Sequence, residues 1–173
     1  MQWVEANLPD SLEYQEFLDR LATADKPDWA TWLLAQFGSD ESIKTVTKIT
    51  EAPKHIFATG SLVFKCAVSI EGRIEAGRGI EAGWGIETGG GIITSEGIQA
   101  GWGIQAGLGI EAGWGIEAGF SIKCELTLSV GTRIFAGLCG WRLPQPTEQE
   151  IHAKEVIGTI ATGEWKRPER VNA

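Results

Sequence analysis

Several features are scarce or missing in this sequence of 173 residues, and each absence excludes a class of protein. No run of 18 apolar residues occurs, so we expect no membrane-spanning segment. The first residues lack the basic and apolar regions of a secretory signal. Lys and Arg number only 15 against 23 Asp and Glu, and the net charge of −8 argues against direct binding to nucleic-acid phosphates.

Cysteine and histidine are also rare. Cys66, Cys124 and Cys139 are an odd number without Cys-x-x-Cys spacing, which favours free thiols in a reducing cytoplasm. The only histidines are His55 and His152. The sequence contains neither the Gly-x-x-x-x-Gly-Lys-Ser/Thr pattern of a phosphate-binding loop nor the Gly-x-Ser-x-Gly pattern of a nucleophile elbow. No nucleotide site or acyl-transfer nucleophile is therefore predicted.

Glycine and tryptophan, in contrast, are abundant, with 23 Gly and 8 Trp. Most of the glycines lie in a six-residue repeat that begins at Ile74 and reads IEAGRG, IEAGWG, IETGGG, IITSEG, IQAGWG, IQAGLG, IEAGWG and IEAGFS. Isoleucine occurs in this register nine times, at positions 74, 80, 86, 92, 98, 104, 110, 116 and 122. The register continues on both sides of this run with Ile56, Leu62, Val68, Leu128 and Ile134.

Each repeat has the alternation of a short strand. The residue two places after the isoleucine is small in most repeats, and the residue between them is polar in most repeats, as at Glu75, Glu81, Glu87, Gln99, Gln105, Glu111 and Glu117. This order places the first and third side chains on one face of a strand. A Gly-x-Gly triplet follows, and because glycine tolerates positive φ, we expect the triplet to turn the corner at which the strand ends.

The strands are predicted to stack in parallel. One glycine in three would destabilise a helix, the glycine spacing is not that of collagen, and no proline interrupts the chain between Pro53 and Pro144. The repeat resembles the hexapeptide repeat of left-handed β-helices, in which three hexads form one triangular coil. We therefore predict a mainly β protein with a parallel β-solenoid over residues 56–138. A Gly-rich antiparallel meander is the alternative.

The repeat departs from the family pattern at one place. The family has a small inward residue four places after the aliphatic one, where this sequence has Arg78, Trp84, Glu96, Trp102, Leu108, Trp114 and Phe120. Either these side chains sit on exposed corners with alanine as the small inward residue, or the winding differs, and the handedness stays open. In a coil of three hexads, two columns should stack along the solenoid: Trp84, Trp102, Phe120 and Leu138, and Leu108 with Leu126.

The segment 1–55 is predicted to be an N-terminal cap that contains a helical hairpin between residues 10 and 37 and a lead-in strand near 42–50. Asp10 and Glu13 match a capping box, and the apolar face of the first helix comprises Tyr14, Phe17, Leu18 and Leu21. Pro27 suits the first position of the second helix, with Asp25 as its cap and Gly38 at its end. The apolar face of the second helix comprises Trp29, Trp32, Leu33 and Phe37.

The segment 139–173 is predicted to be a small α/β cap at the other end. Pro144 and Pro146 mark a loop, and Thr147 with Glu150 matches a capping box for a short helix through Val156. Residues 158–165 have the composition of a strand, and the charged tail 166–173 is expected to fray.

The resemblance to hexapeptide β-helices also implies two enzyme activities, and neither is supported here. Acyltransferases of this kind use a general-base histidine on or near the coil, but His55 lies at the edge of the repeat and His152 beyond it. Carbonic anhydrases of this kind use three zinc-binding histidines, and this sequence has only two. We therefore expect a protein that is not an enzyme, with no catalytic residue, no cofactor and no metal.

The tryptophans of the repeat suggest protein binding instead. In a purely structural role, these tryptophans would pack against one another or under a cap. In a binding role, they would form an exposed aromatic ridge beside glutamates, which is typical of a binding hot spot. The candidate partner-binding residues are Trp84, Trp102, Trp114, Phe120, Glu81, Glu87, Glu111 and Glu117.

Three functions fit this surface. The first is an acidic module that docks a basic partner protein, such as an inhibitor or immunity protein of bacteria or phage. The second is a structural protein that assembles with itself and is similar to bactofilins in being a Gly-spaced solenoid. The third is a DNA mimic, which Ile93, Gln99 and Gln105 weaken because they interrupt the glutamates. Lateral homo-oligomers are compatible with the first two.

Overall fold

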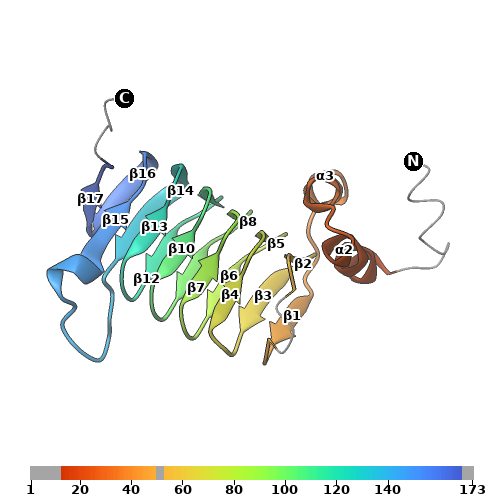
Figure 1. The fold of residues 1–173 in the computed structure, drawn as a ribbon, viewed down its shortest axis with the longest axis horizontal. Coiled ribbons are helices and arrows are strands. Elements are labelled where there is room, and N and C mark those ends of the chain that lie inside the picture. The colour runs from red at the N-terminus through yellow and green to blue at the C-terminus, as the bar shows by residue number, and fades with distance from the viewer. Residues whose placement is uncertain (1–12, 50–52, 169–173) are drawn as a thin grey trace.

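The structure is a computed structural model that describes residues 13–49 and 53–168. It is a parallel β-solenoid of about seven turns with two helices at its N-terminal end (Figure 1). Each coil has three faces. The strands of the first face are β2 (Ile56–Ala58), β5 (Ile74–Ala76), β8 (Ile92–Thr94), β11 (Ile110–Ala112) and the first parts of β14 (Thr127–Ala136) and β16 (Glu155–Thr162).

The other two faces contain the remaining strands. The second face comprises β1 (Ile43–Val46), β3 (Ser61–Phe64), β6 (Ile80–Ala82), β9 (Ile98–Ala100), β12 (Ile116–Ala118) and the last parts of β14 and β16. The third face comprises β4 (Val68–Ile70), β7 (Ile86–Thr88), β10 (Ile104–Ala106), β13 (Ile122–Cys124), β15 (Glu150–His152) and β17 (Glu164–Lys166).

The register confirms a coil of three hexads. Ile74 pairs with Ile92, Ile80 with Ile98, and Ile86 with Ile104, always in parallel and always three hexads apart. The antiparallel meander is therefore wrong. The pairing also extends beyond the strict repeat, because β1 stacks on β3 before it, and β15, β16 and β17 stack on the coils after it.

The core consists of stacked inward columns. The isoleucines of the repeat and the alanines two places later are buried, for example Ile98 and Ala100. Trp84, Trp102, Leu108 and Trp114 are exposed at the corners between strands. Of the two arrangements that the sequence allowed, the one with exposed corners and inward alanines is confirmed.

The corner glycines act differently from the prediction. Among the described glycines, only Gly38, Gly137, Gly158 and Gly163 have positive φ, so the repeat turns its corners without left-handed backbone. At several corners, though not at Gly83, glycine is needed because successive coils approach closely. A Cβ on Gly119 would overlap the carbonyl oxygen of Gly101 one coil earlier.

The N-terminal helices are α2 (Tyr14–Thr23) and α3 (Pro27–Phe37). Leu18 and Leu21 of α2 and Leu33 of α3 are buried in a separate apolar cluster against Phe57. Phe57 is at an outward position of β2, so the helices cover the outer side of the first face at its start. Within the described residues, no helix is long and apolar enough to cross a membrane.

Three details of the helix prediction change. The buried side of α3 consists of Ala30, Leu33 and Leu34, whereas the expected core residues Trp29, Trp32 and Phe37 are exposed, because α3 meets α2 and Phe57 along a narrow stripe only. The N-cap of α3 is Lys26, not Asp25, and Asp25 instead binds Lys54 and His55. Pro27 and Gly38 bound α3 as predicted, and Asp10 lies outside the described residues.

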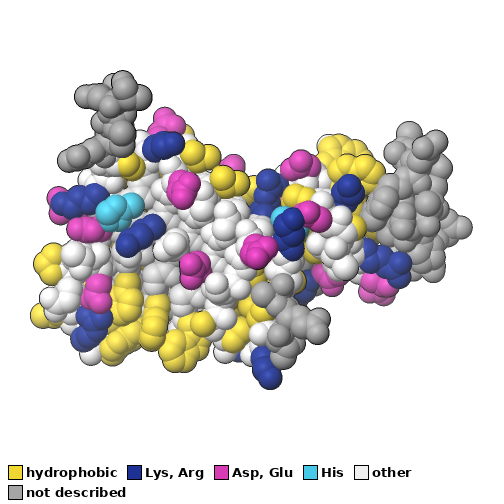
Figure 2. All heavy atoms as spheres, in the orientation of Figure 1, with side chains coloured by type: hydrophobic (Ala, Val, Ile, Leu, Met, Phe, Trp, Pro, Cys, Tyr) yellow, Lys and Arg dark blue, Asp and Glu magenta, His cyan; other side chains and the backbone are white. Residues whose placement is uncertain are grey.

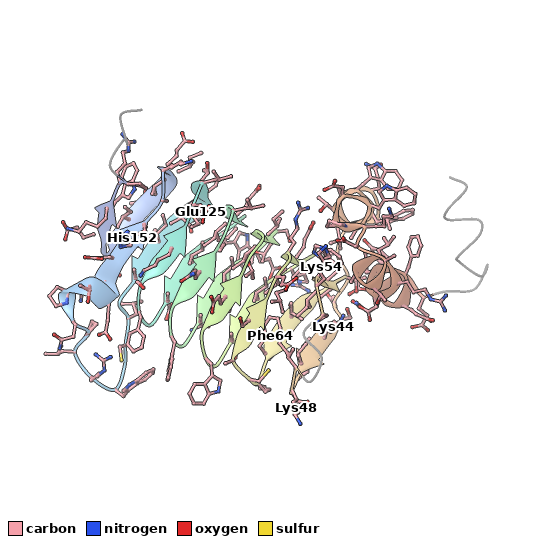
Figure 3. All side chains as sticks on the ribbon, in the orientation of Figure 1. Lys44, Lys48, Lys54, Phe64, Glu125 and His152 are labelled. Atoms are coloured by element: carbon pink, nitrogen blue, oxygen red, sulfur yellow. The ribbon has the colours of Figure 1, made fainter. Side chains whose placement is uncertain are left out.

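Helix α2 also covers the free edge of β2. The Gln15 side-chain amide donates to the carbonyl oxygen of Phe57 at 3.0 Å, and its oxygen accepts from the backbone N–H of Thr59 at 3.0 Å. These are the two bonds that a neighbouring strand would make. Lys44 adds a bond to the same carbonyl and an ion pair with Asp19 at 2.5 Å (Figure 3). Helix α2 thus occupies the edge of β2 that would otherwise be left without a partner.

The C-terminal segment continues the solenoid, so the helix expected from Thr147 to Val156 is wrong. A short 3-10 helix, η1 (Pro146–Gln149), ends before β15, and its capping box joins Gln145 and Glu148 rather than Thr147 and Glu150. The strands prevail because Ile151 stacks on Ile122 in the core. The strand expected over 158–165 is divided between β16 and β17.

The core column gives a test of the fold. Ile98→Asp places an unpaired charge in the interior, and we expect it to destabilise the protein by more than about 4 kcal/mol or to prevent folding. Gln99→Asp, one residue away and outward-facing, should keep the circular dichroism spectrum and nearly the wild-type melting temperature. A folded Ile98→Asp protein would contradict the assignment of this column to the core.

The edge cap gives a second test. Gln15→Ala leaves the Phe57 carbonyl and the Thr59 N–H without their helix partner, and we expect a loss of about 1–3 kcal/mol in the free energy of unfolding. Gln36→Ala, on the exposed side of α3, is the matched control. Equal stability of the two variants in urea unfolding would show that Gln15 does not stabilise the edge.

Candidate protein-binding surface at an aromatic corner

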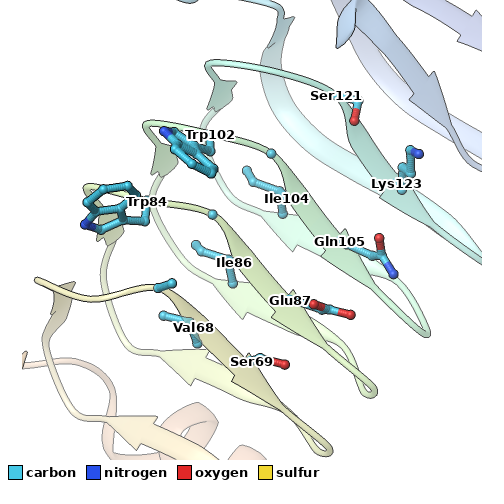
Figure 4. A pocket seen from close by; sticks show the side chains of 13 residues that line it. Val68, Ser69, Trp84, Ile86, Glu87, Trp102, Ile104, Gln105, Ser121 and Lys123 are labelled. Atoms are coloured by element: carbon cyan, nitrogen blue, oxygen red, sulfur yellow. The ribbon is translucent and has the colours of Figure 1, made fainter. Parts of the chain in front are cut away.

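Four aromatic side chains stack along the corner between the second and third faces. Ring centroids of Trp84 and Trp102 are 5.1 Å apart, those of Trp102 and Phe120 6.1 Å, and those of Phe120 and Trp141 6.2 Å. We call this set the aromatic ladder. Figure 4 shows Trp84 and Trp102 side by side at successive corners, above Ile86 and Ile104 in the strands that follow.

The ladder follows directly from the repeat. Its first three members each stand at the middle of a corner triplet and are one coil apart in the chain. The stacking of successive coils therefore brings their rings into contact. Trp84, Trp102 and Trp141 are 47%, 44% and 63% exposed. Figure 2 shows hydrophobic side chains gathered along the lower edge of the molecule, where Figure 1 places the corner between β6 and β7.

The fourth rung departs from the predicted column. Leu138 was expected above Phe120, and its backbone N–H instead bonds to Ala118 while its side chain is exposed. The loop between β14 and β15 brings Trp141 onto Phe120 in its place. Trp141 is outside the six-residue register, so its position in the chain does not predict this contact.

The same loop places a cation on the ladder. The Arg142 guanidinium lies 4.8 Å from the centre of the Phe120 ring and makes two hydrogen bonds of 2.7 Å to the Glu148 carboxylate. The Gln145 backbone N–H donates a third bond to Glu148. The bonds from Arg142, followed by the bond from Gln145, lower the pKa of Glu148 to about 2. Sequence reasoning missed Arg142 and Glu148, because only the folded loop brings them to Phe120.

The predicted glutamates are divided among the faces. Glu81 and Glu117 point outward from the second face, with Gln99 between them, and Glu87 points outward from the third face. The aromatic ladder separates these two faces. Glu81 and Glu117 thus flank the ladder on one side and Glu87 on the other.

Two predicted residues lie away from the ladder. Trp114 is on the corner between the first and second faces, in the same column as the ion pair of Arg78 and Glu96 at 3.0 Å. Glu111 points outward from the first face, beyond that corner. The second face is therefore bordered by the ladder on one side and by Trp114 on the other, and Glu111 does not belong to it.

A shallow groove follows the third face beside the ladder. It is lined by Trp84 and Trp102 at the corner, and its floor presents one outward column: Ser69, Glu87, Gln105 and Lys123 (Figure 4). The column passes from an acidic to a basic side chain along the solenoid. A ligand in this groove would contact aromatic rings and hydrogen-bonding groups together.

Both histidines have structural partners. His55 is buried against Phe57, its Nδ1 accepts from the backbone N–H of Arg73 at 3.0 Å, and its Nε2 is 2.8 Å from Asp25. Both of its ring nitrogens are occupied. His152, on the outer side of the third face (Figure 3), binds Glu150 at 2.8 Å. No group of three metal-ligating side chains occurs among residues 13–49 and 53–168.

No family model, curated protein or solved structure matches this chain.

The Arg142–Glu148 pair gives a test of the loop. Because the folded-state pKa of Glu148 lies below its ordinary value near 4.5, the pair stabilises the loop above that pH and is lost as the pH falls toward 2. Arg142→Gln should raise the pKa of Glu148 toward 4.5, as measured by NMR titration of its side-chain carboxyl. Lys154→Gln, an exposed base elsewhere, should leave it near 2. An unchanged pKa in the Arg142 variant would show that Arg142 does not lower it.

Proposed function

We propose that this protein is a non-enzymatic binding module that docks a partner protein through the aromatic ladder. The observation that carries the proposal is the continuous stack of Trp84, Trp102, Phe120 and Trp141 on a rigid corner, with three of its four rings about half exposed or more. Exposed, preorganised tryptophans lose little side-chain freedom on binding and dominate the energetics of many interfaces.

The charges beside the ladder favour a basic partner. Glu81 and Glu117 project from the second face and Glu87 from the third, and the whole chain has a net charge of −8. An acidic surface of this kind attracts a basic protein at long range and speeds its association. An inhibitor or immunity protein that covers the basic site of a bacterial or phage protein fits this description. The three free cysteines are in keeping with a protein of the cytoplasm.

The other candidates have less support. Head-to-tail polymerisation needs two open ends, and Gln15 and α2 occupy the edge of β2 at one of them. A DNA mimic needs a dense anionic array, and Gln99 separates Glu81 from Glu117 on the second face. The acidic binding module accounts for the aromatic ladder, which neither alternative requires.

The proposal is tested by removing two rungs. Trp84→Ala combined with Trp102→Ala should keep the wild-type circular dichroism spectrum and weaken partner binding by about 2 kcal/mol or more, since hot-spot aromatics supply most of the binding energy. Trp32→Ala is the matched control, because Trp32 is 58% exposed but lies on α3. Trp114 is 61% exposed on the far border of the second face. Weaker partner binding by Trp114→Ala would show that the interface extends across that face.

The assay is affinity capture from lysate of the native host, followed by calorimetry with the purified partner. We expect one stoichiometric basic protein with the wild type and the Trp32 variant, and none with the ladder variant. Glu81→Gln with Glu117→Gln should slow association and weaken its dependence on salt. Equal capture by the folded ladder variant would exclude the ladder as the binding site, and recovery of high-mass assemblies of the chain alone would favour the structural alternative.

A further inference from the structure

The two ends of the solenoid differ in how their strand edges are covered. At the N-terminal end, Gln15 bonds to the backbone of β2 from α2. At the C-terminal end, β16 and β17 are the last strands of their sheets, and among the described residues nothing pairs with their far edges. Figure 1 shows the helices beside β2 at one end of the stack and β16 with β17 at the other.

The last coil closes the core only in part. Val156 and Ile160 follow the buried Leu128 and Ile134 in register, and both are only half-buried. The Trp165 indole N–H donates to the carbonyl oxygen of Ala153 at 3.0 Å, and its residue is in register with the buried Ile151. Trp165 therefore extends the column of Ile122 and Ile151 on the third face, but it leaves the outer edge of β17 unpaired among the described residues. Ile157, on the outer side of β16, is also half-exposed.

We propose that this end is a homodimer interface in which a second copy of the chain pairs with β16 and β17 across a two-fold axis. A second copy is favoured because its own C-terminal end offers the same unpaired parallel edge, and a perpendicular two-fold axis joins two such edges as antiparallel strands. Stacking onto the N-terminal end of another copy would require displacement of Gln15 and α2 from β2. The assembly therefore closes at two copies.

The winding of the coil selects where the axis passes. A coil climbs by one strand spacing, about 4.8 Å, in the course of one turn, so the end of the solenoid is a step rather than a flat surface. In a dimer, all three pairs of facing strands lie one strand spacing apart only when the two-fold axis crosses the middle strand of the last coil. The lowest strand of one copy then faces the highest strand of the other. The middle strand is the second-face part of β16, so the first face of one copy meets the third face of the other.

This arrangement brings complementary side chains together. Antiparallel pairing of the first-face part of β16 with β17 places Glu155 opposite Lys166 of the second copy, and Val156 opposite Trp165 of the second copy. Within one chain, Lys166 binds Glu164 at 2.5 Å and is 42% exposed, so it can bridge to a second carboxylate. The two-fold axis makes each contact twice, with opposite charges at the rim and apolar side chains over the core.

The oligomeric state of the full chain is the first measurement. Sedimentation velocity over a wide range of protein concentrations should show a monomer–dimer equilibrium and no larger species. A monomer at every concentration would overturn the proposal, because it would mean that the edge stays unpaired or is occupied by the chain's own residues. A series of ever larger assemblies would also overturn it, because a two-fold interface is closed.

Charge reversal tests which residues meet. Lys166→Glu and Glu155→Lys each place like charges across the interface twice, and each should raise the dimer dissociation constant at least about tenfold. An equimolar mixture of the two variants should form a heterodimer, because each variant then supplies the charge that the other lacks. Lys123→Glu makes the same change on the third face two coils away and should leave the dimer unchanged.

The mixing step separates interface loss from damage to the fold. A misfolded variant would not recover dimerisation by addition of the other, so failure of the mixture to form a heterodimer would overturn the proposed pairing. Dimerisation of wild-type strength in both single variants would overturn it as well. The Trp84→Ala with Trp102→Ala protein should dimerise normally, so failure of this proposal and failure of the aromatic-ladder proposal are distinguishable.

Discussion

The structure depends on the stacking of each inward isoleucine on the isoleucine three hexads away, held by parallel backbone hydrogen bonds between coils. Ile80, Ile98 and Ile116 form one such column on the second face, and all three are buried. In the coils between Ile74 and Phe120 the second inward place holds alanine or threonine, whereas Phe64, Ile70 and Val130 fill it in the coils before and after. The aromatic side chains of that repeat lie at the corners, where Trp84, Trp102 and Trp114 are exposed to contacts with other molecules.

Because the coil has a fixed period, every surface position is also part of a column. The three corners use this in different ways: one stacks aromatic rings, one stacks Leu108 and Leu126, and one pairs Arg78 with Glu96 below Trp114. The strand spacing of about 4.8 Å lies close to the preferred separation of aromatic rings, so the backbone sets the ring contacts without any side chain leaving its place.

The sequence predicts those parts of the fold that the period controls. The inward columns, the parallel register and the stacking of Trp84, Trp102 and Phe120 all follow from residues that recur every six places. The prediction was wrong where a long-range contact decides the outcome. Ile151 lies within a pattern typical of a helix, yet it stacks on Ile122 as a strand. The Trp141 contact with Phe120 depends on the path of a loop.

The helices illustrate the same limit. Their positions follow from Pro27, Gly38 and the apolar spacing of α2, but which side of α3 is buried depends on where Phe57 meets it. Gln15 could not be recognised as an edge cap from the sequence, because a glutamine on a helix surface has no distinguishing neighbours. Its role depends on the distance between α2 and β2 in the folded chain.

The three-hexad coil also restricts how this gene can change in length. Loss or gain of one whole coil preserves every column, so the isoleucines stay inward and the aromatic ladder becomes one ring shorter or longer. Loss of a single hexad keeps the strand alternation intact but rotates everything after it by one face. If that hexad lies between Trp102 and Trp114, Trp114 moves from its own corner to the corner between the third and first faces, and Phe120 moves from the corner of Trp84 and Trp102 to the one that Trp114 has left. Folding tolerates either change in principle, but a surface built on one corner survives only insertions and deletions of complete coils.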